Sequence, residues 1–199
     1  IDIAKVIAAS NSQPYSHIHQ PGIAVGGHCI PIYPRFYLWN DPQATVVRAA
    51  REANAGMPAH AVSLLTSALG SLQGKKVLVL GISYRGGVKE SAFSGVFGTV
   101  TALKAQGADV VVHDPIALPG VANKHPELST EQDLTTAFAK ADAVVLATEW
   151  KEYRELDPKS VSDSVNNKLI IDGRNVLEIP AWQAAGFKVL ALGKTVQGN

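Results

Sequence analysis

The only cysteine of the chain, Cys29, directly follows two glycines and a histidine in the run Gly26-Gly27-His28-Cys29. A thiolate is a strong nucleophile towards a carbonyl carbon. Adjacent glycines let a ligand or another stretch of backbone approach without meeting a side chain. Free cysteine is also among the residues most often buried as inert packing. The cysteine alone therefore favours packing, whereas its glycine-rich surroundings favour a nucleophile that faces a carbonyl substrate.

Two arginines follow predicted strands and could bind an anion. The turn Gly81-Ile82-Ser83-Tyr84-Arg85-Gly86 is similar to a dinucleotide fingerprint in which Ser83 replaces the second glycine. Arg85 offers a fixed charge for a phosphate or a substrate hydroxyl, although a solvated arginine on a plain turn fits equally well. Arg174 follows a later strand. Because ligands bind beyond the carboxyl ends of parallel strands, we expect the two arginines to converge on one anion.

Other interpretations stay open for the residues near these turns. Arg174 could instead form a salt bridge with Asp172 or Glu178. Tyr84 fits either a core position or a stacking surface for a ligand. Asp114 ends a predicted strand where a ribose-binding acid would lie, but the proline directly after it favours a structural turn.

Neither a metal site nor a serine hydrolase is predicted. Four residues could supply metal ligands: His17, His19, His28 and Cys29. Their spacing matches no closed zinc pattern, and the chain has no second cysteine. Ser83 does not complete a Gly-x-Ser-x-Gly motif, because Arg85 stands at its last position.

The part of the chain before residue 75 is predicted to be mostly helical. A short helix is expected from Ile3 to Ala9. Residues 20–42 are rich in glycine and proline, which predicts irregular structure. Asp41-Pro42 predicts a helix start, with aspartate as N-cap and proline at the first helical position. Apolar residues then recur at helical steps from Val46 to Leu69, with a kink or break expected at Pro58.

This long helix is apolar around much of its circumference, so it is expected to pack on more than one partner. A dimer interface and an intramolecular spacer fit the pattern equally well.

From residue 75 onward the pattern alternates between strands and helices. Strands are predicted at Val77–Gly81, Asp109–His113, Ala143–Ala147, Leu169–Asp172 and Phe187–Leu192. Helices are predicted at 91–106, 129–140 and 180–185, the second opened by a capping box of Ser129 and Gln132. Such alternation predicts βαβ units and a parallel sheet, hence an α/β fold. A boundary near Gly74 would separate a helical segment, 1–74, from a Rossmann-like domain, 75–199.

Composition narrows the class of protein. The chain has 199 residues, of which 46% are hydrophobic and 18% charged, as expected for a folded globular protein. Its net charge of +1 argues against a broad nucleic-acid surface, and no apolar run approaches the roughly 20 residues of a membrane span. One cysteine permits no internal disulfide, which suits a reducing, cytoplasmic location. The chain opens on Ile1 without an initiator methionine, so we expect a piece of a longer protein.

Four motifs in order resemble the UDP-glucose/GDP-mannose dehydrogenase family. Residues 21–31 are similar to its active-cysteine loop, and their His-Cys-Ile form resembles members acting on N-acetylated UDP-sugars such as UDP-N-acetylmannosamine. Arg51-Glu52-Ala53-Asn54, with Met57-Pro58 after it, resembles the central helix. Residues 77–85 and 172–175 resemble the first strand and the arginine loop of the C-terminal domain. The resemblance covers nearly the whole chain and implies the later part of a central helical domain followed by a UDP-binding domain.

The resemblance implies oxidation of a sugar's primary alcohol to a carboxylate with two NAD⁺ reduced in succession. Cys29 would attack the intermediate aldehyde, and the thiohemiacetal would be oxidised to a thioester and hydrolysed. The backbone of four loop residues would hold the sugar: Gly22, Val25, Gly26 and Gly27. Three residues of the second domain would contact the rest of the UDP-sugar: Tyr84, Arg85 and Arg174. A homodimer through the central helix is also expected.

Two positions depart from the family pattern. Tyr33 stands where an acid follows the cysteine by four residues, which leaves His28 as the candidate to activate the thiol or water. Ala92 stands where an arginine would reach NAD, and Lys89 is the expected replacement. The NAD-binding domain would lie outside this chain, so the chain alone is expected to be inactive. The alternative is a non-catalytic nucleotide-binding or dimerisation module in which Cys29 is packing.

Overall fold

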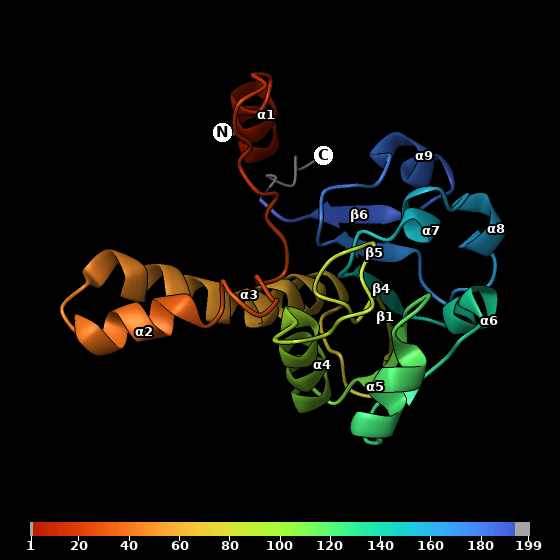
Figure 1. Ribbon diagram of the computed structural model, residues 1–199. Coiled ribbons are helices and arrows are strands. Elements are labelled where there is room, and N and C mark those ends of the chain that lie inside the picture. Colours follow the sequence, from red (N-terminus) through yellow and green to blue (C-terminus); the bar gives the residue numbers. More distant parts are fainter. Residues whose placement is uncertain (1, 194–199) are drawn as a thin grey trace.

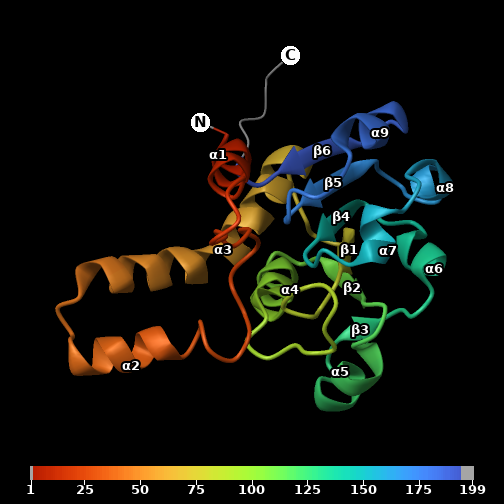
Figure 2. The same cartoon turned by 45° about the horizontal axis from the view of Figure 1, so that its top comes forward.

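A helical hairpin precedes a parallel-sheet domain in the computed structural model, which describes residues 2–193 (Figure 1). Helix α1, Ile3–Ser10, is capped by Asp2, whose carboxylate accepts N–H groups of the first turn. Helix α2, Tyr33–Asn40, runs beside the first half of α3, Thr45–Leu69, and both project away from the sheet (Figure 2). None of the helices among the described residues is both long and apolar enough to cross a membrane.

The sheet has six strands in the order β3-β2-β1-β4-β5-β6, and every neighbouring pair is parallel. The strands are β1 Lys76–Leu80, β2 Asp109–His113, β3 Ser129–Thr130, β4 Ala143–Leu146, β5 Leu169–Asp172 and β6 Lys188–Ala191. This topology confirms the predicted α/β class with a long helix before a Rossmann-like domain. The direction of strand succession reverses between β1 and β4, the place where open α/β sheets bind ligands.

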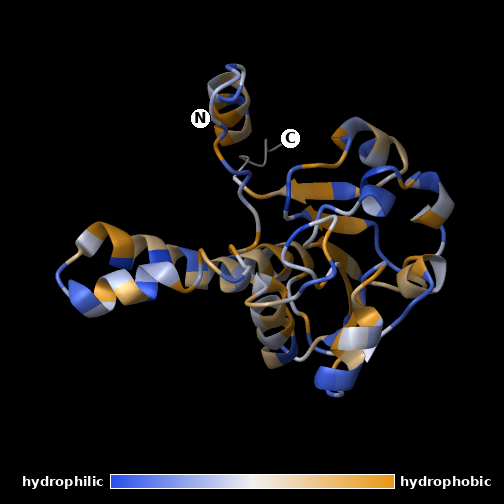
Figure 3. Cartoon of the chain, in the orientation of Figure 1, coloured by the Kyte–Doolittle hydropathy of each residue, from blue (hydrophilic) through white to orange (hydrophobic). Residues whose placement is uncertain are grey.

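Helices cover both faces of the sheet. They are α4 Gly95–Ala105, α5 Leu118–Lys124, α6 Leu134–Phe138, α7 Lys151–Arg154, α8 Lys159–Ser162 and α9 Ile179–Ala184. Alternate side chains of β1 enter two cores: Val77 and Val79 pack with the end of α3, α4 and α5, while Leu78 and Leu80 pack with α6 to α9. Burial on both faces explains the continuous apolar run of this strand. Figure 3 shows the central strands in the orange of apolar residues.

The predicted irregular stretch 20–42 was wrong in its last part, because Tyr33–Asn40 forms α2. Pro34 lies in the first turn of this helix, where its missing N–H costs no hydrogen bond. The predicted helix start at Asp41-Pro42 was also wrong. Asp41 instead ends α2 by donating its N–H to the Tyr37 carbonyl, and α3 begins at Thr45.

Helix α3 continues through Pro58 without the expected break. The proline is buried and packs on α4, where a Cβ added to Gly98 would stand 3.2 Å from the Pro58 Cγ. Packing between the two helices therefore compensates for the hydrogen bond that the proline cannot donate.

The predicted capping box of Ser129 and Gln132 was wrong as well. Ser129 belongs to the short edge strand β3, and Asp133 caps α6 by accepting the N–H of Thr136 at 2.7 Å. Helix α5, which follows the second strand, and the short helices α7 and α8 were not predicted.

Candidate active site at the carboxyl end of the sheet

The loop of residues 22–29 crosses the carboxyl end of the sheet. Ile23 anchors it, with only 3% of its surface exposed. A Cβ added to Gly173, just after β5, would stand 2.6 Å from the Ile23 Cδ1 and 2.6 Å from the Leu146 carbonyl oxygen. The loop can lie this close to the strand ends because residue 173 has no side chain.

The glycine pair of the loop lies against the turn that follows β1. A Cβ added to Gly26 would stand 2.7 Å from the Tyr84 Cβ and 2.8 Å from the Phe93 carbonyl oxygen. Gly27 has φ +93°, and its N–H donates to the Ala92 carbonyl at 2.8 Å. The structure thus brings Gly26 and Gly27 together with Tyr84, and both glycines are required sterically by this contact.

Cys29 is exposed and lies just before α2. Its carbonyl accepts the N–H groups of Ile32 at 3.0 Å and Tyr33 at 2.9 Å, which fixes the backbone at the start of that helix. The thiol is therefore available to a molecule in solution, and the alternative interpretation of Cys29 as buried packing is wrong.

Val25, the fourth predicted sugar contact, is exposed on the same loop. Its N–H donates to the Asn54 Oδ1 at 2.8 Å, so the loop is also held by α3. Sequence reasoning did not include Asn54 among the site residues. Because its partner is a backbone group 29 residues away, no spacing rule could have indicated the contact.

Arg85 and Lys89 extend from the turn after β1. The Arg85 guanidinium carbon lies 6.0 Å from the centroid of the Tyr84 ring, at the limit of a cation–π contact. Both charged residues are exposed, and neither forms an ion pair with a residue in the range 2–193. Arg85 therefore keeps its charge available at this end of the sheet.

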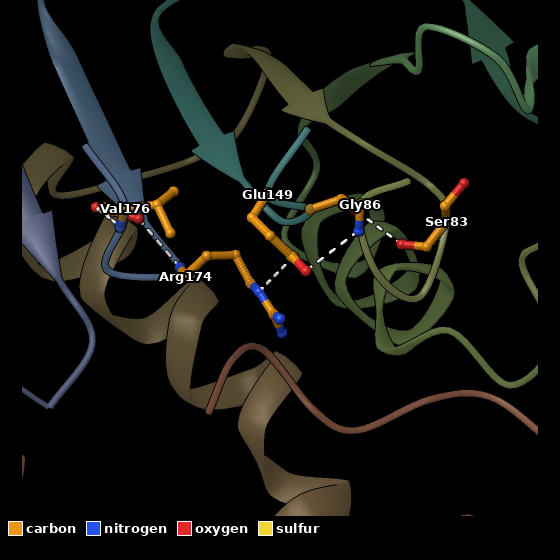
Figure 4. A network of polar contacts seen from close by, with 7 residues as sticks. Ser83, Gly86, Glu149, Arg174 and Val176 are labelled. Carbon is orange, nitrogen blue, oxygen red and sulfur yellow. Dashed lines mark hydrogen bonds and ion pairs between the residues drawn. The ribbon is translucent and has the colours of Figure 1, made fainter. Parts of the chain in front are cut away.

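Arg174 lies across the loop from these groups and directly against Gly22, the first predicted sugar contact. The expected alternative salt bridge with Asp172 or Glu178 was wrong: the Arg174 Nε lies 2.7 Å from the Glu149 Oε2 (Figure 4). Asp172 is fully buried and accepts backbone N–H groups of its own turn, including that of Arg174 at 3.1 Å.

Glu149 is the charged residue of this site that sequence reasoning missed. It follows β4 just as Arg85 follows β1 and Arg174 follows β5. The same rule that selected the arginines, polar residues beyond the carboxyl ends of parallel strands, would have found it.

His28 connects the cysteine loop to a second part of the sheet domain. Its Nε2 lies 3.4 Å from the Glu90 Oε2, and both side chains are largely exposed. The N–H of Ala92 and the His28 side chain hold the pKa of Glu90 below its ordinary value. Over residues 2–193 no three His, Cys, Asp or Glu side chains gather closely enough to hold a metal ion.

Comparison with known proteins connects this geometry to a family. Residues 78–179 match the UDP-binding domain of the UDP-glucose/GDP-mannose dehydrogenase family, and residues 1–56 match the central domain of the same family. The chain belongs to this family. The resemblance expected from the four sequence motifs is therefore confirmed.

Individual relatives of the dehydrogenase family cover nearly the whole chain. The UDP-N-acetyl-D-mannosamine dehydrogenase of Methanocaldococcus jannaschii is 33% identical over 97% of this chain and 44% of the relative. The solved UDP-D-ManNAc dehydrogenase of Pyrococcus horikoshii superposes with a TM-score of 0.81 at 30% identity, covering 97% of this chain and 44% of that one. UDP-glucose 6-dehydrogenase TuaD of Bacillus subtilis is 28% identical over 87% of this chain and 39% of the relative. The chain thus spans less than half of the length of these relatives.

The family resemblance implies NAD, but the sheet domain of this chain does not fit a dinucleotide. Ser83 occupies the position where a glycine would let a pyrophosphate approach, and it is 1% exposed. Helix α4 begins only at Gly95, so no helix N-terminus directly follows the turn. The groups that would hold NAD are missing from this turn.

Asp114 is equally unsuited to bind the ribose of a dinucleotide. It is 3% exposed, and its carboxylate already accepts N–H groups of Ile82, Ser83, Ile116 and Ala117 and of the Trp150 ring. Burial alone would raise the Asp114 pKa, but the backbone donors outweigh burial and lower it. The contacts of Asp114 therefore fit the expected structural turn better than they fit a ribose-binding acid.

Proposed function

We propose that the chain is the substrate-binding portion of an NAD-dependent dehydrogenase that oxidises a UDP-sugar to its uronate. UDP-N-acetylmannosamine is the favoured substrate, because relatives of that name match 97% of this chain. The observation that carries the proposal is the exposed Cys29 on a glycine loop that packs beside Tyr84 and between two arginine-bearing turns.

The two segments of the chain have separate roles in this proposal. Residues 1–74 would form part of a central helical domain that carries the cysteine, and residues 75–199 the UDP-binding domain; residue 1 and residues 194–199 of these ranges lie outside the described residues. The central helix α3 forms the core of a homodimer. Support comes from its projecting first half and from exposed apolar residues: Val46 of α3 at 80%, and Trp39 at 87% and Phe36 at 65% on the neighbouring α2. Sedimentation of the chain as a monomer at all concentrations would contradict the dimer.

Binding of the UDP-sugar would use both sides of the loop. Tyr84 offers a half-buried ring for stacking, and Arg85 and Arg174 offer guanidinium groups to the diphosphate. The backbone of Gly22, Val25, Gly26 and Gly27 would hold the sugar near Cys29. A ligand bound this way spans the loop and the sheet domain, and so requires both parts of the chain.

Cys29 would perform the covalent step. Its thiolate sulfur forms a bond to the carbonyl carbon of the sugar aldehyde, and the carbonyl π electrons move to oxygen, which takes a proton from water. The product is a thiohemiacetal, and this addition neither oxidises nor reduces the sugar. His28, adjacent in sequence and paired with Glu90, is the candidate for deprotonating the thiol.

The oxidations that flank this addition require a hydride acceptor, and we assign none of that chemistry to the described residues. NAD would be bound mainly by another part of the protein, with the exposed Lys89 as the only contact proposed from this chain. A reducing, cytoplasmic setting would keep the single thiol reactive.

Calorimetric titration of the 199-residue chain with UDP tests the proposal. Measurable binding is expected, and binding should slow the reaction of Cys29 with iodoacetamide when a UDP-sugar is present. An absence of any UDP binding would contradict the proposal. Binding of UDP with no protection of the thiol by UDP-sugar would favour the alternative, a non-catalytic nucleotide-binding module.

A further inference from the structure

The carboxylate of Glu149 lies at the centre of three turns at the carboxyl end of the sheet. Its Oε2 is 2.7 Å from the Arg174 Nε, and its Oε1 accepts the Gly86 N–H at 3.2 Å. Gly86 belongs to the turn after β1, Glu149 follows β4 and Arg174 follows β5. Figure 4 shows the Glu149 side chain reaching between the other two residues.

We propose that Glu149 is a positioning residue that holds Arg174 for the diphosphate of the substrate. The inference rests on the proposed UDP-sugar function and adds a specific role to that site. Glu149 itself need not touch the substrate. It acts by fixing which nitrogens of the Arg174 guanidinium remain available.

The geometry of Arg174 supports this role. A guanidinium carries five N–H donors in a rigid plane, and the Glu149 carboxylate lies against its Nε edge as a close charge contact that lacks hydrogen-bond geometry. Arg174 forms no ion pair with any carboxylate of residues 2–193 other than that of Glu149. On its other side the arginine lies against the backbone of Gly22. The side chain is thus held between Glu149 and the Gly22 backbone, and an anion would meet the part of the guanidinium that remains exposed.

Partial burial makes the contact more than a surface ion pair. The Arg174 side chain is 12% exposed and the Glu149 side chain 23% exposed. Ion pairs shielded from water interact more strongly than exposed ones, and removal of one partner leaves the other charge partly buried and unpaired. A free arginine would have to lose its rotamer freedom when the substrate binds, whereas a held one has already lost it.

Contact with Gly86 extends the effect to the other arginine. Gly86 directly follows Arg85, and a Cβ added to Gly86 would stand 2.5 Å from the Glu149 carbonyl oxygen. The backbone at Glu149 and its carboxylate therefore both set the turn that carries Tyr84 and Arg85. One acid keeps the two cationic groups in a fixed relation.

Titration of the 199-residue chain with UDP tests the role of Glu149. We expect Glu149→Gln to weaken UDP binding roughly tenfold, as for loss of the charged partner of a partly shielded arginine. Glu152→Gln, which removes the same charge from an exposed position on α7, is the matched control and should bind like the wild type. Unchanged or tighter binding by Glu149→Gln would overturn the inference, while wild-type chain that fails to bind UDP would instead overturn the proposed function.

A second comparison separates positioning from a general structural role. In an Arg174→Met background, the further change Glu149→Gln should have little or no effect on UDP affinity, because the group that Glu149 holds is already gone. A tenfold loss that persists in this background would show that Glu149 acts elsewhere and would overturn the inference.

Gly22→Ala keeps the test decisive if Glu149→Gln does not fold, which thermal unfolding would reveal. The added Cβ would collide with the Arg174 guanidinium. We expect weaker UDP binding in this variant, with uridine binding, followed by NMR, unchanged. Equal losses for UDP and uridine, or no loss for either, would contradict a guanidinium positioned for the diphosphate.

Discussion

Gly26 packs directly against Tyr84, since a Cβ added to Gly26 would stand 2.7 Å from the Tyr84 Cβ. The same Cβ would lie 2.8 Å from the Phe93 carbonyl oxygen, a backbone atom that cannot turn aside. This contact fastens the cysteine loop to the sheet domain.

Substituting Gly26→Ala should therefore loosen the loop. We expect the free energy of unfolding to fall by roughly 1–3 kcal/mol, as for overpacking of a tight contact. Urea denaturation measures the change. Gly56→Ala is the matched control: Gly56 lies in α3 with nothing within 4 Å of an added Cβ, so alanine should stabilise that helix by roughly 0.5–1 kcal/mol. A Gly26→Ala chain as stable as the wild type would contradict the tight contact.

Cys29→Ser should leave the stability of the chain within about 0.5 kcal/mol of the wild type, because the side chain is exposed. The same change should abolish uronate formation by the complete enzyme, since a hydroxyl is a much weaker nucleophile than a thiolate. Thermal unfolding and an assay of uronate product measure the two effects. Full activity in Cys29→Ser would remove the covalent role, whereas a large loss of stability would contradict the exposed position of the thiol.

Asp114 should make the stability of the sheet domain depend on pH. Its pKa is lower in the folded chain than the ordinary value of 3.8, because backbone donors prefer the charged form. The stabilisation is therefore present above about pH 5 and is lost as the pH falls through the lowered pKa. Asp114→Asn should cost about 2 kcal/mol or more near pH 7, since several donors lose their acceptor.

Unfolding by urea at a series of pH values checks this prediction. The difference between wild type and Asp114→Asn should shrink as the pH falls below 3.8. The control Asp109→Asn changes the same charge at an exposed position of β2 and should cost little stability near pH 7. A difference that stays constant down to pH 3 would mean that hydrogen-bond geometry, and not ionisation, accounts for the effect.

The strands were predictable because their signal is local. Val77 to Leu80 are 0–1% exposed, and only a strand covered on both faces buries four consecutive residues in this way. The start of α6 was less predictable, because two residues that could each cap this helix, Ser129 and Asp133, lie close together in the sequence. Ser129 and Gln132 fit one pattern, but pairing of Ser129 with Val111 in the sheet left Asp133 as the cap.

Candidate site residues that follow parallel strands could be predicted from the sequence, because a general rule places ligands at that end of the sheet. Contacts that hold the site together between distant segments of the chain were not predicted. Arg85 and Arg174 were found because they follow parallel strands, and Glu149 could have been found in the same way. No pattern in the sequence indicates that Asn54 holds the Val25 backbone or that Gly22 lies against Arg174. Such contacts join segments from 29 to more than 150 residues apart and depend on how the loop packs on the sheet.

NAD should fail to bind the 199-residue chain even though UDP binds. Ser83 fills the place where a pyrophosphate would approach, the Asp114 carboxylate is fully occupied, and α4 begins at Gly95, too late to present its N-terminus. Calorimetric titration with NAD should therefore give no heat of binding, and mixing the chain with NAD and UDP-N-acetylmannosamine should give no NADH absorbance at 340 nm.

Ser83→Gly sharpens the same prediction. If the serine alone excluded the dinucleotide, the glycine variant would acquire NAD binding, but the occupied Asp114 and the distant helix start should keep it from doing so. UDP titration of the same preparation shows that the variant is folded and that its substrate side is intact. NADH formation by the wild-type chain would contradict the assignment of hydride transfer to another part of the protein, because the sheet domain would then hold the acceptor itself.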